Sequence, residues 1–126
     1  MSQYPDTLRY TKDHEWTSTT GNVAVVGITH FAKDQLGDVV YLERPEVGAE
    51  VTKGAPFGVV ESTKAVSELF APLSGKVVKV NKALVDAPEG VNDDPQGKAW
   101  MIEIELSAPA EAAELLSSAD YVKLLG

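Results

Sequence analysis

Lys64 is the side chain of this sequence whose setting most needs a chemical explanation. It lies in the run GVVESTKAVSELFAPLSGKVV, residues 58–78, where most other positions are of types that fold into a protein interior. An ammonium group buried there without a partner would be costly, so we expect Lys64 to point outward. The spacing leaves two local structures open. Residues 62–70 could form a helical turn, or Lys64 could lie at a hairpin tip, although the usual Asn-Gly or Asp-Gly signal is missing. An ordinary solvated lysine is a further alternative.

The other residues capable of chemistry do not form a catalytic apparatus. The two histidines, His14 and His30, do not have the spacing of metal ligands, so we expect no metal site. His14 and Glu15 could act as a general base pair, but adjacent residues usually point apart, which favours a surface or capping histidine. Because phosphate-binding glycine loops, dinucleotide fingerprints and nucleophile elbows are also missing, the sequence predicts no catalytic residues and no enzyme activity.

Composition limits the remaining classes of protein. A chain of 126 residues with 44% hydrophobic residues predicts one domain, residues 1–126, with a single core. The chain has no cysteine, which excludes disulfides, thiolate zinc sites and thiol redox chemistry. We expect a soluble, cytoplasmic protein without membrane association, because the sequence shows neither a signal peptide nor a long apolar run.

The charge balance argues against nucleic acid as a partner. The formal net charge of -8 would repel a phosphate backbone, whereas it would speed the encounter with a basic protein surface. Simple solubility explains the same charge equally well.

Short segments rich in β-forming residues dominate the first hundred positions and predict an antiparallel, mainly β fold. The expected strands are 22–28, 38–43, 50–54, 57–62, 76–80 and 99–106. The segment MIEIEL, residues 101–106, alternates as a half-exposed strand requires.

Helical signals are confined to two places. Residues 29–37 predict a short helix that is capped by Thr29 and ends at Gly37. Residues 107–126 predict one or two helices that cover the β layer, with their apolar face formed by Ala112, Leu115, Leu116, Ala119, Val122 and Leu125. Residues 86–99 are expected to be a turn-rich loop.

A weak internal repeat suggests two similar halves. LGDVVYL, residues 36–42, and SGKVVKV, residues 74–80, share a Gly-x-Val-Val-x-aliphatic pattern, and each precedes a Pro-Glu turn. Two such units could face each other and bury their apolar sides as a sandwich, although a chance match of valine-rich strands is an alternative.

The run around Lys64 resembles the lipoyl-attachment hairpin of the glycine cleavage H-protein family. The resemblance extends over nearly the whole chain, because YTKDHEW, GNVAVVGITHFAKDQLGDVVYLERPEVGAEVTKGAPFG and VNDDPQGKAWMIEI match successive family segments in order. It implies a hybrid barrel-sandwich of the lipoyl and biotinyl carrier type with a C-terminal helical segment. It also implies that lipoate is attached to Lys64 through an amide, which removes the charge of the lysine.

The resemblance further implies a carrier without catalytic activity that serves three enzymes. A pyridoxal-phosphate glycine decarboxylase loads the lipoyl arm with an aminomethyl group, a tetrahydrofolate-dependent aminomethyltransferase unloads it, and a dihydrolipoyl dehydrogenase reoxidises it. A lipoylating enzyme attaches the cofactor. We expect the carrier to be a monomer.

Family positions imply two carboxylates beside the arm. Glu15 and Glu68 match the acidic residues that line the resting cleft, where a cationic amine needs an acidic neighbour and protection from water. A plain surface glutamate is the alternative at each position. Asp13 stands where the family often has a small hydroxyl residue.

Glu61 and Gly75 match positions that lipoylating enzymes are thought to read. For Gly75 we favour a structural role first, because PLSG is a turn that requires a residue without side-chain clash. Thr63 replaces the usual valine without preventing attachment, and Trp16 and Trp100 are expected to be core or covering residues.

Several rival functions remain at this stage. A biotin carrier uses a related hairpin, but its lysine usually lies between methionines, whereas Thr63 and Ala65 flank Lys64 here. A lipoyl domain of a 2-oxo acid dehydrogenase and a carrier that relays lipoate to other proteins are closer alternatives. A small enzyme that uses His14 and an unmodified interaction module belong to other classes.

Overall fold

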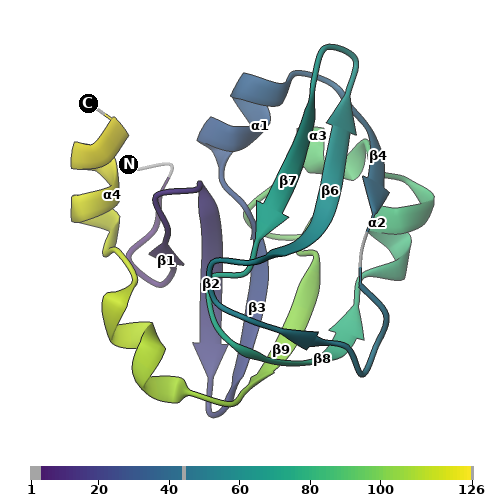
Figure 1. The fold of residues 1–126 in the computed structure, drawn as a ribbon. Coiled ribbons are helices and arrows are strands. Elements are labelled where there is room, and N and C mark those ends of the chain that lie inside the picture. Colours follow the sequence, from purple (N-terminus) through teal and green to yellow (C-terminus); the bar gives the residue numbers. More distant parts are fainter. Residues whose placement is uncertain (1–3, 44, 126) are drawn as a thin grey trace.

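The computed structural model describes residues 4–43 and 45–125, and its main feature is a pair of β-sheets (Figure 1). Within these residues the larger sheet has the strand order β1-β2-β3-β9-β8-β5 and the smaller sheet the order β4-β6-β7. The strands of the larger sheet are β1 (Arg9–Tyr10), β2 (Glu15–Thr20), β3 (Val23–Ile28), β9 (Ile102–Leu106), β8 (Gly75–Val80) and β5 (Glu50–Val51). Those of the smaller sheet are β4 (Val39–Glu43), β6 (Pro56–Ser62) and β7 (Val66–Phe70). The pairs are antiparallel, and the predicted mainly β sandwich is confirmed.

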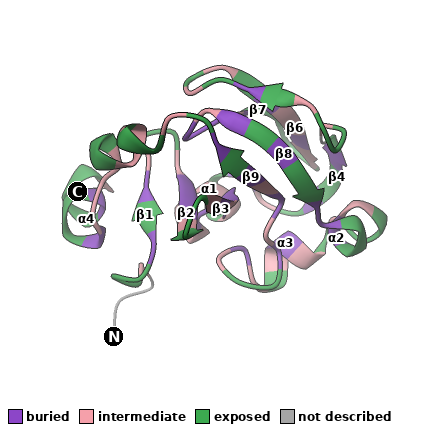
Figure 2. Ribbon diagram, turned by 90° about the horizontal axis from the view of Figure 1, so that it is seen from below, coloured by how far each residue is buried: buried purple, intermediate pink, exposed green. Residues whose placement is uncertain are grey.

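The main core lies between the two sheets. On β9 the side chains of Ile102, Ile104 and Leu106 are buried and Glu105 is exposed, which confirms the predicted alternation (Figure 2). The two segments of the internal repeat lie in different sheets, one in β4 and one in β8, as expected for two units that face each other.

A second, smaller cluster joins β1, β2 and α4 and consists of Leu8, Tyr10, Trp16 and Tyr121. Tyr10 and Tyr121 stack with ring centroids 4.8 Å apart, so this cluster attaches the C-terminal helix to the sheet. Trp16 is buried, and its indole N–H donates to the carbonyl of Pro95, which confirms it as a core residue.

The short helix α1 (His30–Leu36) confirms the sequence prediction, including both ends. The Thr29 hydroxyl accepts a hydrogen bond from the amide of Ala32, and Gly37 follows the helix with a φ of 79° that favours glycine.

The expected loop over residues 86–99 was only partly right. Helix α2 (Lys82–Asp86) ends where the expected loop begins, and helix α3 (Gly90–Asp93) lies within that loop. The Asn81 side chain caps α2, while the buried Val91 fixes α3 to the core. A four-residue helix is too short to leave a periodic signal in the sequence.

The C-terminal segment divides as predicted into a 3-10 helix, η1 (Pro109–Glu114), and α4 (Ser118–Leu125). Gly126, which the sequence prediction included, lies outside the described residues. The predicted apolar face was only partly right. Ala112, Leu115, Leu116 and Leu125 pack partly buried against the core clusters. Ala119 and Val122 are exposed, while Tyr121, which was not predicted, is fully buried. The stacking of Tyr121 on Tyr10 sets the orientation of the helix instead.

Residues 62–70 form a hairpin between β6 and β7 and not a helix, so that alternative was wrong. The tip of the hairpin projects beyond the body of the molecule, next to α1 (Figure 1).

Candidate functional site

The tip of the β6–β7 hairpin is a tight turn held by one serine side chain. The Ser62 hydroxyl oxygen accepts from the amides of Lys64 and Ala65, at 3.3 and 3.0 Å, and the Ser62 amide donates to the carbonyl of Ala65. Thr63 and Lys64 have no positive φ, so this turn does not need the Asn-Gly pair that the sequence lacks. Lys64 is therefore displayed at an exposed and locally ordered position.

The body of the protein supports the tip from one side. The amide of Thr63 donates to the carbonyl of Asp38 at 3.0 Å. A Cβ added to Gly37 would lie 3.3 Å from Cε of Lys64, so the lysine stem runs close to the end of α1. Gly37 thus serves both as the helix terminator and as the open space beside the lysine.

A groove, called here the hairpin groove, begins next to Lys64 and leads along β7 towards the β1–β2 turn. Its volume is about 310 Å³. Its walls come from residues 65–69 of the hairpin, from Ala32, Gln35 and Leu36 of α1, and from residues 13–15. The groove therefore extends from Ala65, the chain neighbour of Lys64, to both predicted glutamates, Glu15 and Glu68.

Glu15 supplies a buried carboxyl group to the hairpin groove. Its side chain is 2% exposed, and its two oxygens accept from the Thr11 hydroxyl at 2.7 Å and from the Phe70 amide at 3.3 Å. Burial raises the pKa of Glu15 to about 8, although both hydrogen bonds act in the opposite direction. The reading of Glu15 as a plain surface glutamate was wrong.

Glu68 and Asp13 also line the hairpin groove, but both are exposed. They can place negative charge near its opening. Asp13 donates its backbone amide to the Thr11 hydroxyl oxygen, so the hydroxyl group beside Glu15 comes from Thr11 and not from position 13.

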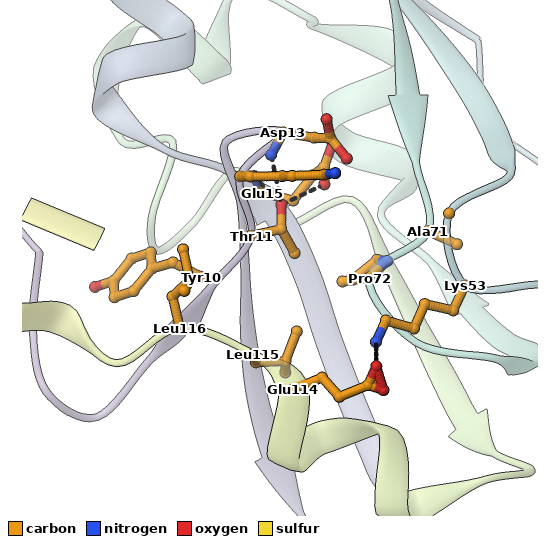
Figure 3. A pocket seen from close by; sticks show the side chains of 12 residues that line it. Tyr10, Thr11, Asp13, Glu15, Lys53, Ala71, Pro72, Glu114, Leu115 and Leu116 are labelled. Atoms are coloured by element: carbon orange, nitrogen blue, oxygen red, sulfur yellow. Dashed lines mark hydrogen bonds and ion pairs between the residues drawn. The ribbon is translucent and has the colours of Figure 1, made fainter. Parts of the chain in front are cut away.

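Glu15 also borders a second cavity, of about 510 Å³, on its other side (Figure 3). Figure 3 shows Asp13, Thr11 and Glu15 at one end of this cavity and the ion pair between Lys53 and Glu114 at another. Glu15 thus lines both the hairpin groove and the second cavity.

His14 does not form an acid-base pair with Glu15. Its Nδ1 lies 2.8 Å from the Tyr121 hydroxyl, whereas the Glu15 carboxyl is bonded to Thr11 and Phe70. His14 has a φ of 68°, the left-handed conformation, and its ring lies 4.5 Å from that of Phe31. Burial lowers the pKa of His14, and Asp13 opposes this shift.

Glu61 and Gly75 lie in different sheets. Glu61 is half-buried in β6 and pairs with Val66, close to the hairpin tip. Gly75 opens β8, where a Cβ would lie 2.1 Å from the carbonyl oxygen of Glu105. The predicted need for a residue without side-chain clash at Gly75 is therefore confirmed, but its reason is corrected: Gly75 lies in β8, and the backbone of β9, not a turn, occupies the space that a side chain would need.

Three residues of the site were missed from the sequence. Ser62 had a usable signal, since a serine two residues before a turn centre commonly binds the following amides. Thr11 and Tyr121 had no sequence signal. Thr11 bonds to Glu15, four positions along the chain, and Tyr121 bonds to His14, more than a hundred positions away.

Two kinds of feature are absent from the described residues. No cluster of three or more histidine, aspartate or glutamate side chains there could hold a metal ion. None of the described helices has the length and apolar character needed to cross a membrane.

A two-sheet β fold that presents a lysine on a hairpin tip, beside a groove that ends at a carboxyl group, has the arrangement of the lipoyl-carrier class of proteins. The family model for the glycine cleavage H-protein matches residues 8–126. The chain therefore belongs to the glycine cleavage H-protein family.

Individual relatives agree over nearly the full length. The glycine cleavage system H protein of Carboxydothermus hydrogenoformans is 54% identical over 125 residues, which cover 99% of this chain and 96% of that protein. The one from Anaeromyxobacter sp. (strain K) is 59% identical over 119 residues, covering 94% and 93%. The crystal structure of a glycine cleavage system H protein from Mycobacterium marinum superposes with a TM-score of 0.89 at 41% identity, covering 97% of this chain and 98% of that one.

Proposed function

We propose that this chain carries lipoate on Lys64 and is the lipoyl carrier of a glycine cleavage system. The observation that carries the proposal is the exposed Lys64 at the hairpin tip, next to a groove that leads to the buried carboxyl of Glu15. Family membership supports the same role.

The residues around Lys64 fit an amide-linked arm. The lysine stem passes Gly37 without obstruction, and the hairpin groove offers apolar walls from α1 and β7. Lipoate held by Lys64 would supply a disulfide. One of its sulfur atoms would take the aminomethyl group of glycine while the other became a thiol, and the dithiol left after transfer would be reoxidised. The groove of this chain would exclude water from the loaded arm, and the tether keeps the arm at a high effective concentration near each enzyme.

Glu15 is the residue that would hold the cationic amine of the load. Its carboxyl is largely protonated at neutral pH because of burial, so an ammonium group arriving beside it favours release of the Oε proton and formation of an ion pair. Glu68 at the exposed side of the groove would add negative charge. Both roles concern binding, and the carrier itself performs no catalytic step.

The partners follow from the carrier role. They are the glycine decarboxylase, the aminomethyltransferase, the dihydrolipoyl dehydrogenase and a lipoylating enzyme, for which Glu61 and Gly75 remain the proposed recognition positions. We further propose that residues 1–126 act as one domain. The cytoplasmic location and the monomeric state stay predictions.

Intact-mass analysis and peptide mapping test the proposal. Protein from lipoate-competent cells should carry one lipoyl group on the peptide that contains Lys64, and K64R should carry none. The variant K98R, at another exposed lysine, is the matched control and should be modified like the parent. A bare parent mass, a biotin increment, or lipoate on another lysine would each contradict the proposal.

A further inference from the structure

Tyr121 in the C-terminal helix lies at the meeting point of two walls of the hairpin groove. Its hydroxyl is 2.8 Å from Nδ1 of His14 and 2.8 Å from the hydroxyl of Thr29. His14 is part of the turn that carries Glu15, and Thr29 caps α1, which supplies the opposite wall. The carbonyl of His14 also accepts from the amide of Thr29 at 3.0 Å.

The hydrogen bonds along this contact can run in one direction that gives every donor proton an acceptor. The Ala32 amide donates to the Thr29 hydroxyl oxygen, so the Thr29 proton is free to go to the Tyr121 oxygen. The Tyr121 hydroxyl then donates to Nδ1 of His14, which places the imidazole proton on Nε2. In the reverse order His14 would donate to Tyr121 and Tyr121 would donate to Thr29. The Thr29 hydroxyl proton would then have no acceptor among the described contacts, which is costly because Thr29 is fully buried.

We propose that Tyr121 is a positioning residue for the hairpin groove, because its hydroxyl fastens the His14 turn to the Thr29 cap and so fixes Glu15 relative to α1. The inference rests on the proposed carrier function and deepens it. It makes helix α4, which does not line the hairpin groove, a part of the machinery that holds the loaded arm.

The packing of Tyr121 is separable from its hydroxyl, because the chain contains a matched tyrosine. Tyr10 stacks on Tyr121 and is equally buried, but its hydroxyl donates to the carbonyl of Pro5 and not to the groove walls. Y121F and Y10F therefore each remove one buried phenol oxygen from the same stack. Only Y121F removes the side-chain link between His14 and Thr29, while the backbone hydrogen bond from Thr29 to His14 remains in both variants.

The first test uses NMR on the unloaded protein. In the parent, the nitrogen shifts of His14 should report the Nε2–H tautomer. In Y121F the pKa of His14 should rise, because the neutral imidazole loses its donor, whereas Y10F should titrate like the parent. The groups that face His14 are Asp13 and Glu15 on its own turn, Glu68 across the groove, and Tyr121 on α4. The same four groups face it in Y10F.

The second test measures how long the aminomethyl load survives on the lipoylated carrier in the absence of the transferase. Y121F should lose the load roughly 2- to 10-fold faster than the parent, the factor expected for one hydrogen bond. Y10F, which keeps the side-chain link between His14 and Thr29, should behave like the parent.

The possible failures are distinguishable. If intact mass shows no lipoate on Lys64, the proposed function fails, while the NMR test still judges the positioning role. A parent His14 in the Nδ1–H tautomer would overturn the inference even if Y121F does not fold. Equal effects of Y10F and Y121F on the His14 titration and the load lifetime would also overturn it, because packing alone would then explain them.

Discussion

Glu15 is the residue whose chemistry depends most on its burial. A carboxyl group with both oxygens bonded to protein donors would normally ionise easily, but its burial outweighs the hydrogen bonds and leaves the pKa at about 8 instead of the ordinary 4.5. The folded chain therefore binds one more proton than the unfolded chain over most of this interval. Folding thus becomes less favourable as pH rises through it.

The first prediction follows for E15Q, whose amide stays neutral at every pH. The parent should lose stability by up to about 1.4 kcal/mol per pH unit between the two pKa values, and the variant should lack this loss. The difference in the free energy of unfolding between E15Q and the parent should therefore shift in favour of E15Q from pH 5 to pH 8, as measured by urea unfolding. E68Q, at the exposed glutamate of the same groove, is the control and should follow the parent. A gain that does not change with pH would contradict the assigned pKa.

A second prediction concerns Gly75. In G75A the new methyl group would meet the Glu105 carbonyl and the Ile104 side chain, so we expect β8 and β9 to separate locally. Overpacking of this kind costs roughly 1–3 kcal/mol, and the unfolding midpoint should fall accordingly. Lipoylation of G75A should be compared with that of E61Q, a position without this constraint. Unchanged stability of G75A together with lost lipoylation would instead favour direct recognition of Gly75.

At the scale of elements, the hairpin tip depends on the side chain of Ser62. Ser62 satisfies two amides of the turn, and the exposed Ser67 on β7 does not accept from the turn amides. S62A should therefore speed amide hydrogen exchange at Lys64 and Ala65 and slow lipoylation, while S67A should change neither. Exchange rates in S62A equal to those of the parent would show that the strands alone hold the tip.

The sequence predicted those elements whose signals are local. Helix α1 has its cap and its terminating glycine within nine residues, and β9 has a clean alternation. Strand β2, with the sequence EWTSTT, was not predicted, although its threonines are typical of strands. The buried face of α4 could not be predicted, because it depends on a tyrosine stack formed with residues at the other end of the chain.

At the scale of the molecule, the candidate site is built from segments that are far apart in sequence. The family motif located Lys64, and family positions located Glu15 and Glu68, which the structure brings to one groove. Thr11, Phe70 and Tyr121 complete the surroundings of Glu15 and His14 through contacts between distant elements. Only the folded chain reveals such partners, since their spacing in sequence follows no rule.

The net charge of -8 leads to a last prediction, about how the carrier meets its enzymes. A negative carrier is steered towards basic docking surfaces at low salt, where the screening length is about 30 Å at 0.01 M and falls to about 8 Å at 0.15 M. Under conditions limited by encounter, the rate at which each enzyme uses the lipoylated carrier should therefore fall several-fold over this range. Free lipoyl amide, which carries no charge, provides the control because its rate should barely change. If both substrates slow equally, salt acts on the enzyme and the charge of the carrier serves solubility alone.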